Sequence, residues 1–355
     1  MEPITHFLFG GVLARAGLNR TSALATTTLV LAAEAPDLDV LGNFGGRIFA
    51  FEHHRGITHT LAGAPFVAAF VVLLLWLWYR AWGARQWRPG KPPPRWGVLF
   101  GLAWLSCLGH ILLDFTNSYG VRPFDPFAHR WYSWDTVFVA EPVLWAILLG
   151  GLLLPALFRL VTQEVRSGRV AAPRGRAGAI VALVLIAIFW GVRDFEHRRA
   201  IAAMEALTYR GQEPLRVSAY PYYINPFRWY GVVETRDYYV RQIVDSLTPE
   251  VDPDGRAMFR HKPQETPVTQ AARQSYLGRV YLDWAAYPIL EVEQLTPPDH
   301  GYLVRIYDLR FAYPDSRRRT PLGGWVHLDE NLKVVRQNFG VRDIPGRSQR
   351  ASLRK

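Results

Sequence analysis

Cysteine is almost absent from this sequence, and its scarcity limits the chemistry that the chain can perform. The 355 residues include one cysteine, Cys107, which lies inside an apolar run. A single cysteine cannot form an intrachain disulfide, so cysteine usage indicates neither an oxidising nor a reducing compartment. It also excludes zinc ribbons and other sites built from several thiolates. A metal site in this chain would therefore use imidazole and carboxylate ligands.

Long apolar runs are absent from the second half of the chain. They all fall before about Asp194, and the remainder is polar, aromatic and rich in proline and arginine. The second half also lacks the GxGxxG, P-loop and GxSxG motifs of nucleotide-binding proteins and serine hydrolases. We therefore predict an α-helical polytopic membrane domain at residues 1–194, a β-rich α+β soluble domain at 195–345, and a disordered basic tail at 346–355.

Negative charge is scarce relative to positive charge, because the formal net charge is +11. Nucleic-acid-binding proteins show such an excess, but many arginines here lie in loops between apolar runs, where they indicate orientation in a membrane. The expected partner is therefore the lipid bilayer and not nucleic acid. The sequence does not indicate an oligomeric state.

About six segments are apolar enough to be membrane segments. A spanning helix needs about 20 mostly apolar residues. Four segments reach or approach this length: Thr60–Tyr79, Gly97–Phe115, Val139–Leu160 and Gly178–Val192. Two earlier segments, Ile4–Ala16 and Ser22–Ala35, are shorter. We expect these two to form a helical hairpin that packs against the longer helices.

Arginines predict how these segments are oriented. They concentrate in the connections Arg80–Arg95 and Arg159–Arg176 and in the hairpin turn, which places these three connections in the cytoplasm. The alternating connections Pro36–His59 and Thr116–Phe138 then lie on the outer face. The same parity makes Arg193–Lys355 extracytoplasmic, so we expect a multi-pass protein of the cell (inner) membrane.

Ionisable side chains gather at the predicted outer ends of five segments. They are His6, Asp37, Asp39, His53, His54, Arg55, His59, His110, Asp114 and Glu141. An ionisable residue at bilayer depth costs about 2.5–3.5 kcal/mol on insertion scales and is usually functional. Their convergence predicts a shared metal site at the outer interface.

The pair His110 and Asp114 is the most informative part of this set. The two residues are four positions apart in an apolar run, so on a helix they share one face and their side chains can meet. An imidazole and a carboxylate so placed can bind one cation or bridge two. The alternative is a plain hydrogen bond that joins two helices.

Two shorter motifs complete the predicted site. Pro36 disfavours helix at the residue before it, so Asp37 and Asp39 in APDLD are expected on a turn, unless the motif is only a helix stop. His54 and His59 are five positions apart, which is off-face for a helix, so they require a bend that Gly56 could supply.

Several motifs in the same order resemble a known family. THFLFGG, APDLD, HHRGITHT, GHILLDFTNSYG and RPFDPF, over roughly Met1–Pro142, resemble the YdjM-type membrane-bound metal-dependent hydrolases. The resemblance implies a metal site at His6, Asp37, Asp39, His54, Arg55, His59, His110 and Asp114. The position of His53 commonly holds another residue in that family, whereas Glu141 matches an acidic residue that often precedes proline.

The residues and the resemblance together predict a membrane-bound metal-dependent hydrolase. The expected ligands are His6, Asp37, His54, His59, His110 and Asp114, holding one or two divalent ions, with zinc or manganese favoured. The expected catalytic residues are Arg55, which would bind a phosphate, and Asp39 or Glu141, which would act as a base or orient a ligand. The expected substrate is a phosphoester or a lipid-linked molecule. The alternatives are a non-catalytic protein with a structural metal, a cation transporter, and a scaffold whose sheet domain binds a partner.

The second half predicts a mostly antiparallel sheet. The runs LRVSAYPYYI, RWYGVVETRDYYVRQIV, LEVEQL, YLVRIYDLRFAY and GGWVHLDENLKVVRQNF are rich in Tyr, Trp and Val and are separated by turn residues. We expect a helix within Gln270–Tyr287. The histidines of this half show no spacing typical of metal ligands.

Overall fold

The protein was analysed as a computed structural model, which describes residues 1–83, 92–165, 175–297, 299–312, 322–340 and 344; side chains are described for these residues except 159–165. The chain divides into two compact units. One contains Met1–Asp39, Arg55–His197 and Pro221–Pro226, and the other contains Val40–His54, Arg198–Tyr220 and Phe227–Lys355. The predicted basic tail lies outside the described residues, as does half of each of the two long arginine-rich connections.

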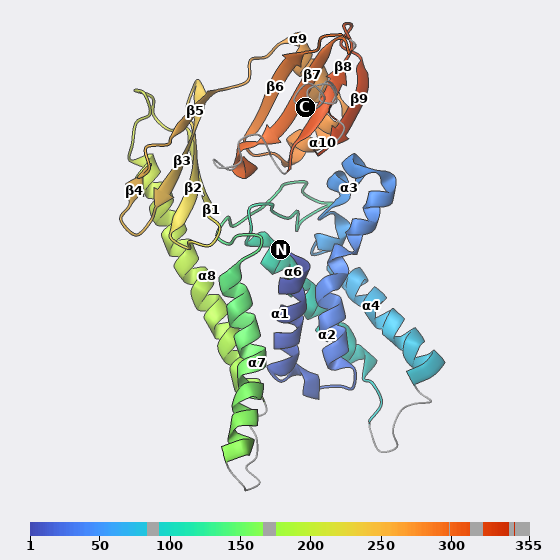
Figure 1. The fold of residues 1–355 in the computed structure, drawn as a ribbon. Helices are drawn as coiled ribbons and strands as arrows, with labels where there is room; N and C mark the ends of the chain where they lie inside the picture. The colour runs from blue at the N-terminus through green and yellow to red at the C-terminus, as the bar shows by residue number, and fades with distance from the viewer. Residues whose placement is uncertain (84–91, 166–174, 298, 313–321, 341–343, 345–355) are drawn as a thin grey trace, which may run out of the picture. The chain divides into compact units, whose positions relative to one another are not determined.

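Helices and short 3-10 turns make up the first unit (Figure 1). In chain order they are α1 (Pro3–Arg15), η1 (Leu18–Arg20), α2 (Ala25–Glu34), η2 (Ala35–Gly45, shared with the second unit), η3 (Ile57–His59), α4 (Ala64–Trp78), η4 (Tyr79–Gly83), α6 (Trp96–Phe115), α7 (Pro142–Val165) and α8 (Arg176–Glu205, also shared with the second unit). The predicted hairpin is present, because α1 and α2 pack against one another.

Three helical stretches of the described chain are long and apolar enough to cross a membrane: Ala64–Gly83, Trp96–Phe115 and Arg176–Glu205. The apolar part of α7, Pro142–Phe158, is shorter, and α1 and α2 have 13 and 10 residues. The prediction of a helical membrane domain is therefore confirmed, while the structure supports three of the expected six segments as full spans. The last of these helices, α8, continues beyond the predicted segment end at Val192 to Glu205.

Two apolar clusters hold the helical unit together. One joins α1, α7 and α8 around Val12, Leu144, Leu148 and Ala182, and the other joins α2, α4 and α6 around Ala32, Ala68, Ala103 and Cys107. Small residues let the helices approach closely. A Cβ on Gly10 of α1 would lie 2.9 Å from the Leu29 carbonyl oxygen of α2, so only glycine fits this crossing.

Polar side chains of α6 fix α2 at the end where it carries the predicted site. Ser106 Oγ donates to the Leu29 carbonyl at 2.6 Å, and Cys107 Sγ lies 3.4 Å from the Ala32 carbonyl. His110 Nδ1 continues this ladder to the Ala33 carbonyl at 2.6 Å. Because the last carbonyls of a helix lack intrahelical partners, the donors to Ala32 and Ala33 satisfy groups that would otherwise be buried without one.

The second unit contains two β-sheets (Figure 1). The first has the strands β1 (Arg216–Pro221), β2 (Arg228–Glu234), β3 (Tyr238–Asp245), β4 (Glu250–Val251) and β5 (Met258–His261). Its order is β1-β2-β3-β4, with β5 also paired to β3. The β2–β3 hairpin is antiparallel and runs from the pair Arg228–Asp245 to the pair Glu234–Tyr239. Ala200 and Met204, near the end of α8, pack on its core.

The second sheet is an antiparallel meander in the order β6-β7-β8-β9. It consists of β6 (Pro288–Gln294), β7 (Tyr302–Asp308), β8 (Gly324–Leu328) and β9 (Val334–Phe339), with the 3-10 turn η5 (Leu309–Phe311) after β7. The helices α9 (Pro267–Gln274) and α10 (Tyr276–Trp284) precede and pack against it. The predicted strands and the predicted helix are confirmed, whereas β4 and β5 were not predicted, because they are short and surrounded by turn residues.

One further helix, α3 (Arg47–His53), belongs to this second unit although it lies between predicted site residues in the sequence.

Candidate metal centre

Four side chains of the helical unit converge on one point. Asp37 comes from η2, His59 from the end of η3, and His110 and Asp114 from α6. One ligand atom from each residue lies within 4.8 Å of the other three. His59, His110 and Asp114 are fully buried, while the Asp37 side chain is 22% exposed. The expected pairing of His110 and Asp114 on one face of a helix thus appears in the structure.

The separations printed for these four atoms are close to those of ligands around a single ion. His59 Nε2 lies 3.0 Å from His110 Nε2, 3.3 Å from Asp37 Oδ1 and 3.4 Å from Asp114 Oδ2. His110 Nε2 lies 3.5 Å from the same two oxygens. Ligand atoms about 2.0–2.2 Å from a tetrahedral zinc ion are separated by about 3.3–3.6 Å. The residues therefore fit a divalent cation.

The hydrogen bonds behind the two imidazoles determine which form they present. A carbonyl oxygen only accepts, so His110 Nδ1 carries the proton that it donates to Ala33, and neutral His110 exposes a lone pair at Nε2. His59 Nδ1 lies 3.4 Å from the Asp39 carboxylate and 3.0 Å from the Thr58 hydroxyl. A proton on this nitrogen suits Asp39, which leaves the Nε2 lone pair of His59 facing that of His110.

The four converging atoms are thus acceptors, and the described contacts place no donor at their centre. Asp114 Oδ2 is buried without a hydrogen-bond partner in the described chain. Burial lowers the pKa of His59 to about 3, so its imidazole is neutral, which is the form that binds metals. A cation is the group that such a set of acceptors lacks.

Arg55 lies beside the four ligands and is buried among hydrogen-bond acceptors. It is 3% exposed, and its guanidinium donates to Asp114 Oδ1 at 2.8 Å, to the Gly120 carbonyl at 2.8 Å and to Asn117 Oδ1 at 3.2 Å. Burial lowers its pKa to about 10, which leaves it charged at neutral pH. A side chain so engaged holds Asp114 in place, and its predicted binding of a substrate phosphate stays a prediction.

The backbone of Arg55 is also unusual. Its φ angle is +55°, in the left-handed region that a non-glycine residue adopts at a cost of about 1–3 kcal/mol. The backbone N–H of Arg55 donates to Asp39 Oδ2 at 2.7 Å, so Asp39 joins the backbone before η3 to the imidazole at its end. Asp39 is therefore not one of the four converging side chains, but it contacts one of them, His59. Such a contact suits the second of its two predicted roles, which was to orient a ligand.

His6 lies next to the four ligands. Its ring stacks on His110 with centroids 3.6 Å apart, and its Nε2 is 3.5 Å from Asp114 Oδ1, the oxygen that also contacts the Met1 amino group. Both ring nitrogens of His6 are buried without a hydrogen-bond partner in the described chain.

Two other candidates have different surroundings. His54 caps the C-terminus of α3 in the second unit and is not among the four side chains. Glu141 lies directly before α7, where its carboxylate accepts from the Val143 N–H at 3.3 Å and faces the buried Arg193. Glu141 thus acts as the N-terminal cap of α7 in the structure. Its predicted catalytic role stays a prediction. His53, which is not among the predicted ligands, is exposed.

Sequence reasoning missed Asn117 and the Ala33 carbonyl, which hold Arg55 and His110. Asn117 lies three residues after Asp114, just beyond the end of a predicted helix, and this closeness in the sequence could have indicated that it belongs to the site. Nothing in the sequence distinguishes the Ala33 carbonyl, because a backbone acceptor is defined only by the packing of α2 on α6.

Comparisons with known proteins agree with this division of the chain. A family model described as "YdjM inner membrane protein" matches residues 1–200, and one described as "YfhP C-terminal alpha/beta plait domain" matches residues 267–343. The chain is 22% identical over 308 residues to the "Uncharacterized protein YfhP" of Bacillus subtilis (strain 168), covering 85% of this chain and 81% of that protein. No solved structure matches the chain significantly. The resemblance noted in the motifs is confirmed.

Proposed function

Because this chain belongs to the YdjM inner membrane protein family, we propose that it is a membrane-bound metal-dependent hydrolase acting at the outer membrane interface. The observation that carries the proposal is the buried convergence of four acceptors, Asp37, His59, His110 and Asp114. In a membrane protein such a set is costly to bury unless a cation neutralises it. The preferred ions are zinc and manganese, which suit imidazole with carboxylate.

The residues of the site divide into ligands and residues that orient them. A divalent ion held there supplies a Lewis acid for a phosphoester and makes water a better nucleophile near neutral pH. Asp39 holds the proton on His59 Nδ1, and the Ala33 carbonyl holds the one on His110 Nδ1, so both rings present Nε2. Arg55 fixes the second oxygen of Asp114. His6 is proposed as an additional ligand for a second ion, which its unpartnered ring nitrogens support.

The surroundings of the site favour a lipid-linked substrate. Asp37 is the accessible ligand, and its neighbour Leu38 is 48% exposed. On the other side of the site, Ile57 and Leu61 flank His59 and are 58% and 45% exposed. Apolar side chains around the exposed ligand suit an approach from the acyl region of a bilayer, whereas a water-soluble substrate would be served by polar ones. We therefore propose a phosphoester carried on a lipid as the substrate class.

The proposal is tested by elemental analysis of the detergent-purified protein, followed by an activity screen. We expect about one or two equivalents of zinc or manganese, and turnover of a phosphodiester or lipid-linked phosphate that a chelator abolishes and added metal restores. Acyl esters serve as the comparison class. Protein without metal would contradict the site, and full occupancy without turnover of either class would contradict the enzymatic activity.

One observation favours a second candidate, a structural metal site. Catalytic zinc commonly has three protein ligands and an open position, whereas structural sites are closed by four. Here four side chains converge and three of them are fully buried. The screen above separates the two readings, because a structural ion would raise the melting temperature on binding and support no turnover.

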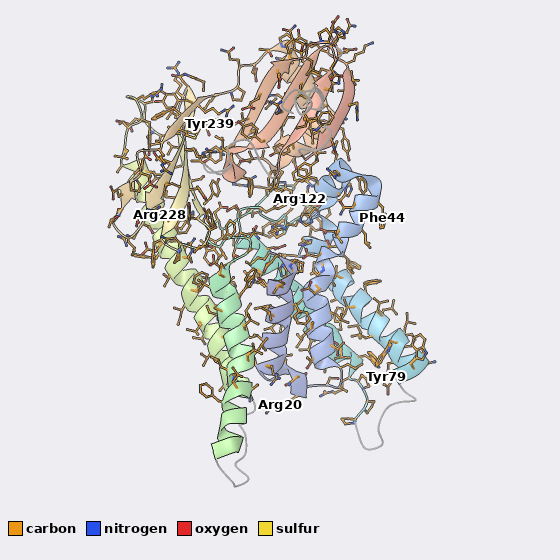
Figure 2. The ribbon with its side chains drawn as sticks, viewed as in Figure 1. Arg20, Phe44, Tyr79, Arg122, Arg228 and Tyr239 are labelled. Carbon is orange, nitrogen blue, oxygen red and sulfur yellow. The ribbon has the colours of Figure 1, made fainter. Side chains whose placement is uncertain are left out.

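The orientation of the protein gives a prediction that does not depend on the metal. Cys107 is buried, so it provides little background for thiol labelling. Arg20 and Glu250 are both exposed and are suitable sites for new cysteines (Arg20 is labelled in Figure 2). In cells with a permeabilised outer envelope, a membrane-impermeant maleimide should label Glu250→Cys directly and Arg20→Cys only after lysis. The reverse pattern would place the sheet that contains Glu250 in the cytoplasm.

A further inference from the structure

The segment Val40–His54 connects the two compact units twice. The chain leaves the helical unit after Asp39, and Val40–His54, hereafter the excursion, packs with the C-terminal residues. It then returns to the helical unit at Arg55. The excursion thus interrupts the candidate metal site in the sequence, with Asp37 on one side and His59 on the other.

The excursion is held in the C-terminal unit by one aromatic side chain. Phe51 of α3 is 7% exposed and stacks on Phe339 of β9 with ring centroids 4.2 Å apart. It also contacts Trp284 edge-on at 5.2 Å and stacks with Tyr281 at 5.7 Å, both on α10. Such an aromatic cluster buries a large apolar area and has a defined geometry, so it fixes the position of α3.

Little else in the excursion is buried. The hydroxyl of Tyr276 donates to the Glu52 carboxylate, which adds one polar contact to the aromatic cluster. In contrast, Val40 and Leu41 are 58% and 59% exposed, and Phe44 is 93% exposed (labelled in Figure 2). A seven-residue helix is unstable on its own in water, so the order of α3 depends on its docking through Phe51.

The two ends of the excursion are joined at the metal centre. The Arg55 N–H donates to Asp39 Oδ2 at 2.7 Å, which closes the excursion at its base. Asp39 also lies 3.4 Å from His59 Nδ1, and Asp37 is only two residues before it. The excursion therefore restrains two of the four ligands through short stretches of backbone.

We propose that the C-terminal plait domain positions the metal site through the excursion, with Phe51 as the positioning residue. When Phe51 is docked, the backbone at Asp37–Asp39 and at Arg55–His59 is held in the arrangement that brings the ligands together. When Phe51 is undocked, the backbone at both ends of the excursion can adopt more conformations, and the ligands are no longer held together in advance of metal binding. The inference rests on the proposed function in one respect, because the site that Phe51 positions is proposed to bind a metal ion.

The test compares Phe51→Ala with Phe44→Ala in the full-length protein. The two variants remove the same side chain from the same excursion, but Phe44 is exposed and Phe51 is buried. Hydrogen exchange of the metal-free proteins is followed by mass spectrometry, and zinc affinity is measured by competition with a chelating dye. Phe51→Ala should raise exchange at α3 and, by about tenfold, at residues 37–39 and 55–59, and should weaken zinc binding by about tenfold. Phe44→Ala should match the unmodified protein in both measurements.

Each outcome is informative. If α3 exchanges faster in Phe51→Ala while residues 37–39 and 55–59 and the zinc affinity are unchanged, the plait domain does not position the site and the inference is wrong. If the unmodified protein binds no zinc, the proposed function fails, but the exchange at residues 37–39 and 55–59 still decides the inference. Exchange at β6 and β7 should be the same in all three proteins, and a general increase there would show that the substitution unfolds the domain.

Discussion

Replacing His59 with alanine should remove the metal from the purified protein. His59 Nε2 lies 3.0–3.4 Å from the other three ligand atoms, so the substitution leaves three ligands and a hole at the centre of the set. Four-ligand zinc sites bind with about 10–16 kcal/mol, or about 3 kcal/mol per ligand, which is a loss of about a hundredfold in affinity. Elemental analysis after size-exclusion chromatography should therefore find substoichiometric metal, and Asp114→Ala should behave in the same way.

His53→Ala is the matched control for this experiment. His53 is another histidine of the same sequence motif, but its side chain is 52% exposed and contacts the Phe49 carbonyl and Glu52. This variant should retain the full complement of metal. Equal metal content in His59→Ala and His53→Ala, with both proteins extracted and folded, would show that the four side chains are joined by hydrogen bonds alone.

Replacing Arg55 with methionine should destabilise the metal-free protein by about 3–5 kcal/mol. The substitution keeps roughly the length of the side chain but removes the donors to Asp114, Asn117 and Gly120, so a fully buried carboxylate loses its guanidinium partner. Breaking one side of a buried ion pair typically has this effect. Unfolding by denaturant in detergent micelles measures the change.

Two further variants show whether the loss comes from this ion pair. Arg20→Met removes an exposed arginine and should change stability by less than about 0.5 kcal/mol. Adding Asp114→Asn to Arg55→Met removes the uncompensated charge, so the double variant should be less destabilised than the sum of the single changes. Full stability of Arg55→Met together with lost turnover would instead support the original prediction that Arg55 binds substrate.

The sequence predicted those parts of the site that depend on local geometry. His110 and Asp114 could be paired because four residues on a helix correspond to one turn, and their apolar surroundings made an ionisable pair conspicuous. Asp37 and His59 could be predicted as ligands only because several segments carry ionisable residues at the same predicted outer end, and because of the family resemblance. The roles of His54 and Arg55 could not be derived, since the left-handed backbone at Arg55 and the turn that follows it depend on contacts with Asp39, Asn117 and Gly120.

The fold was predictable where hydrophobic pattern alone decides it. The apolar runs became α4, α6, α7 and α8, and the aromatic β-like runs became antiparallel strands. The sequence did not indicate that Val40–His54 packs with the C-terminal unit. Its sequence is as glycine-rich as an ordinary connection, and the partner of Phe51 lies near the far end of the chain, where no local periodicity can reveal it.

The contact between Phe51 and Phe339 also sets the order of events during biosynthesis. The two residues are 288 positions apart (339 − 51), so at about 5–20 residues per second the ribosome needs about 15–60 s to supply the second after the first. Until then α3 has no partner, although Asp37, His59, His110 and Asp114 have all been synthesised. A nascent chain that stops before β9 would thus contain every metal ligand without the domain that positions two of them. Completion of the metal centre would therefore report that the whole protein has been made.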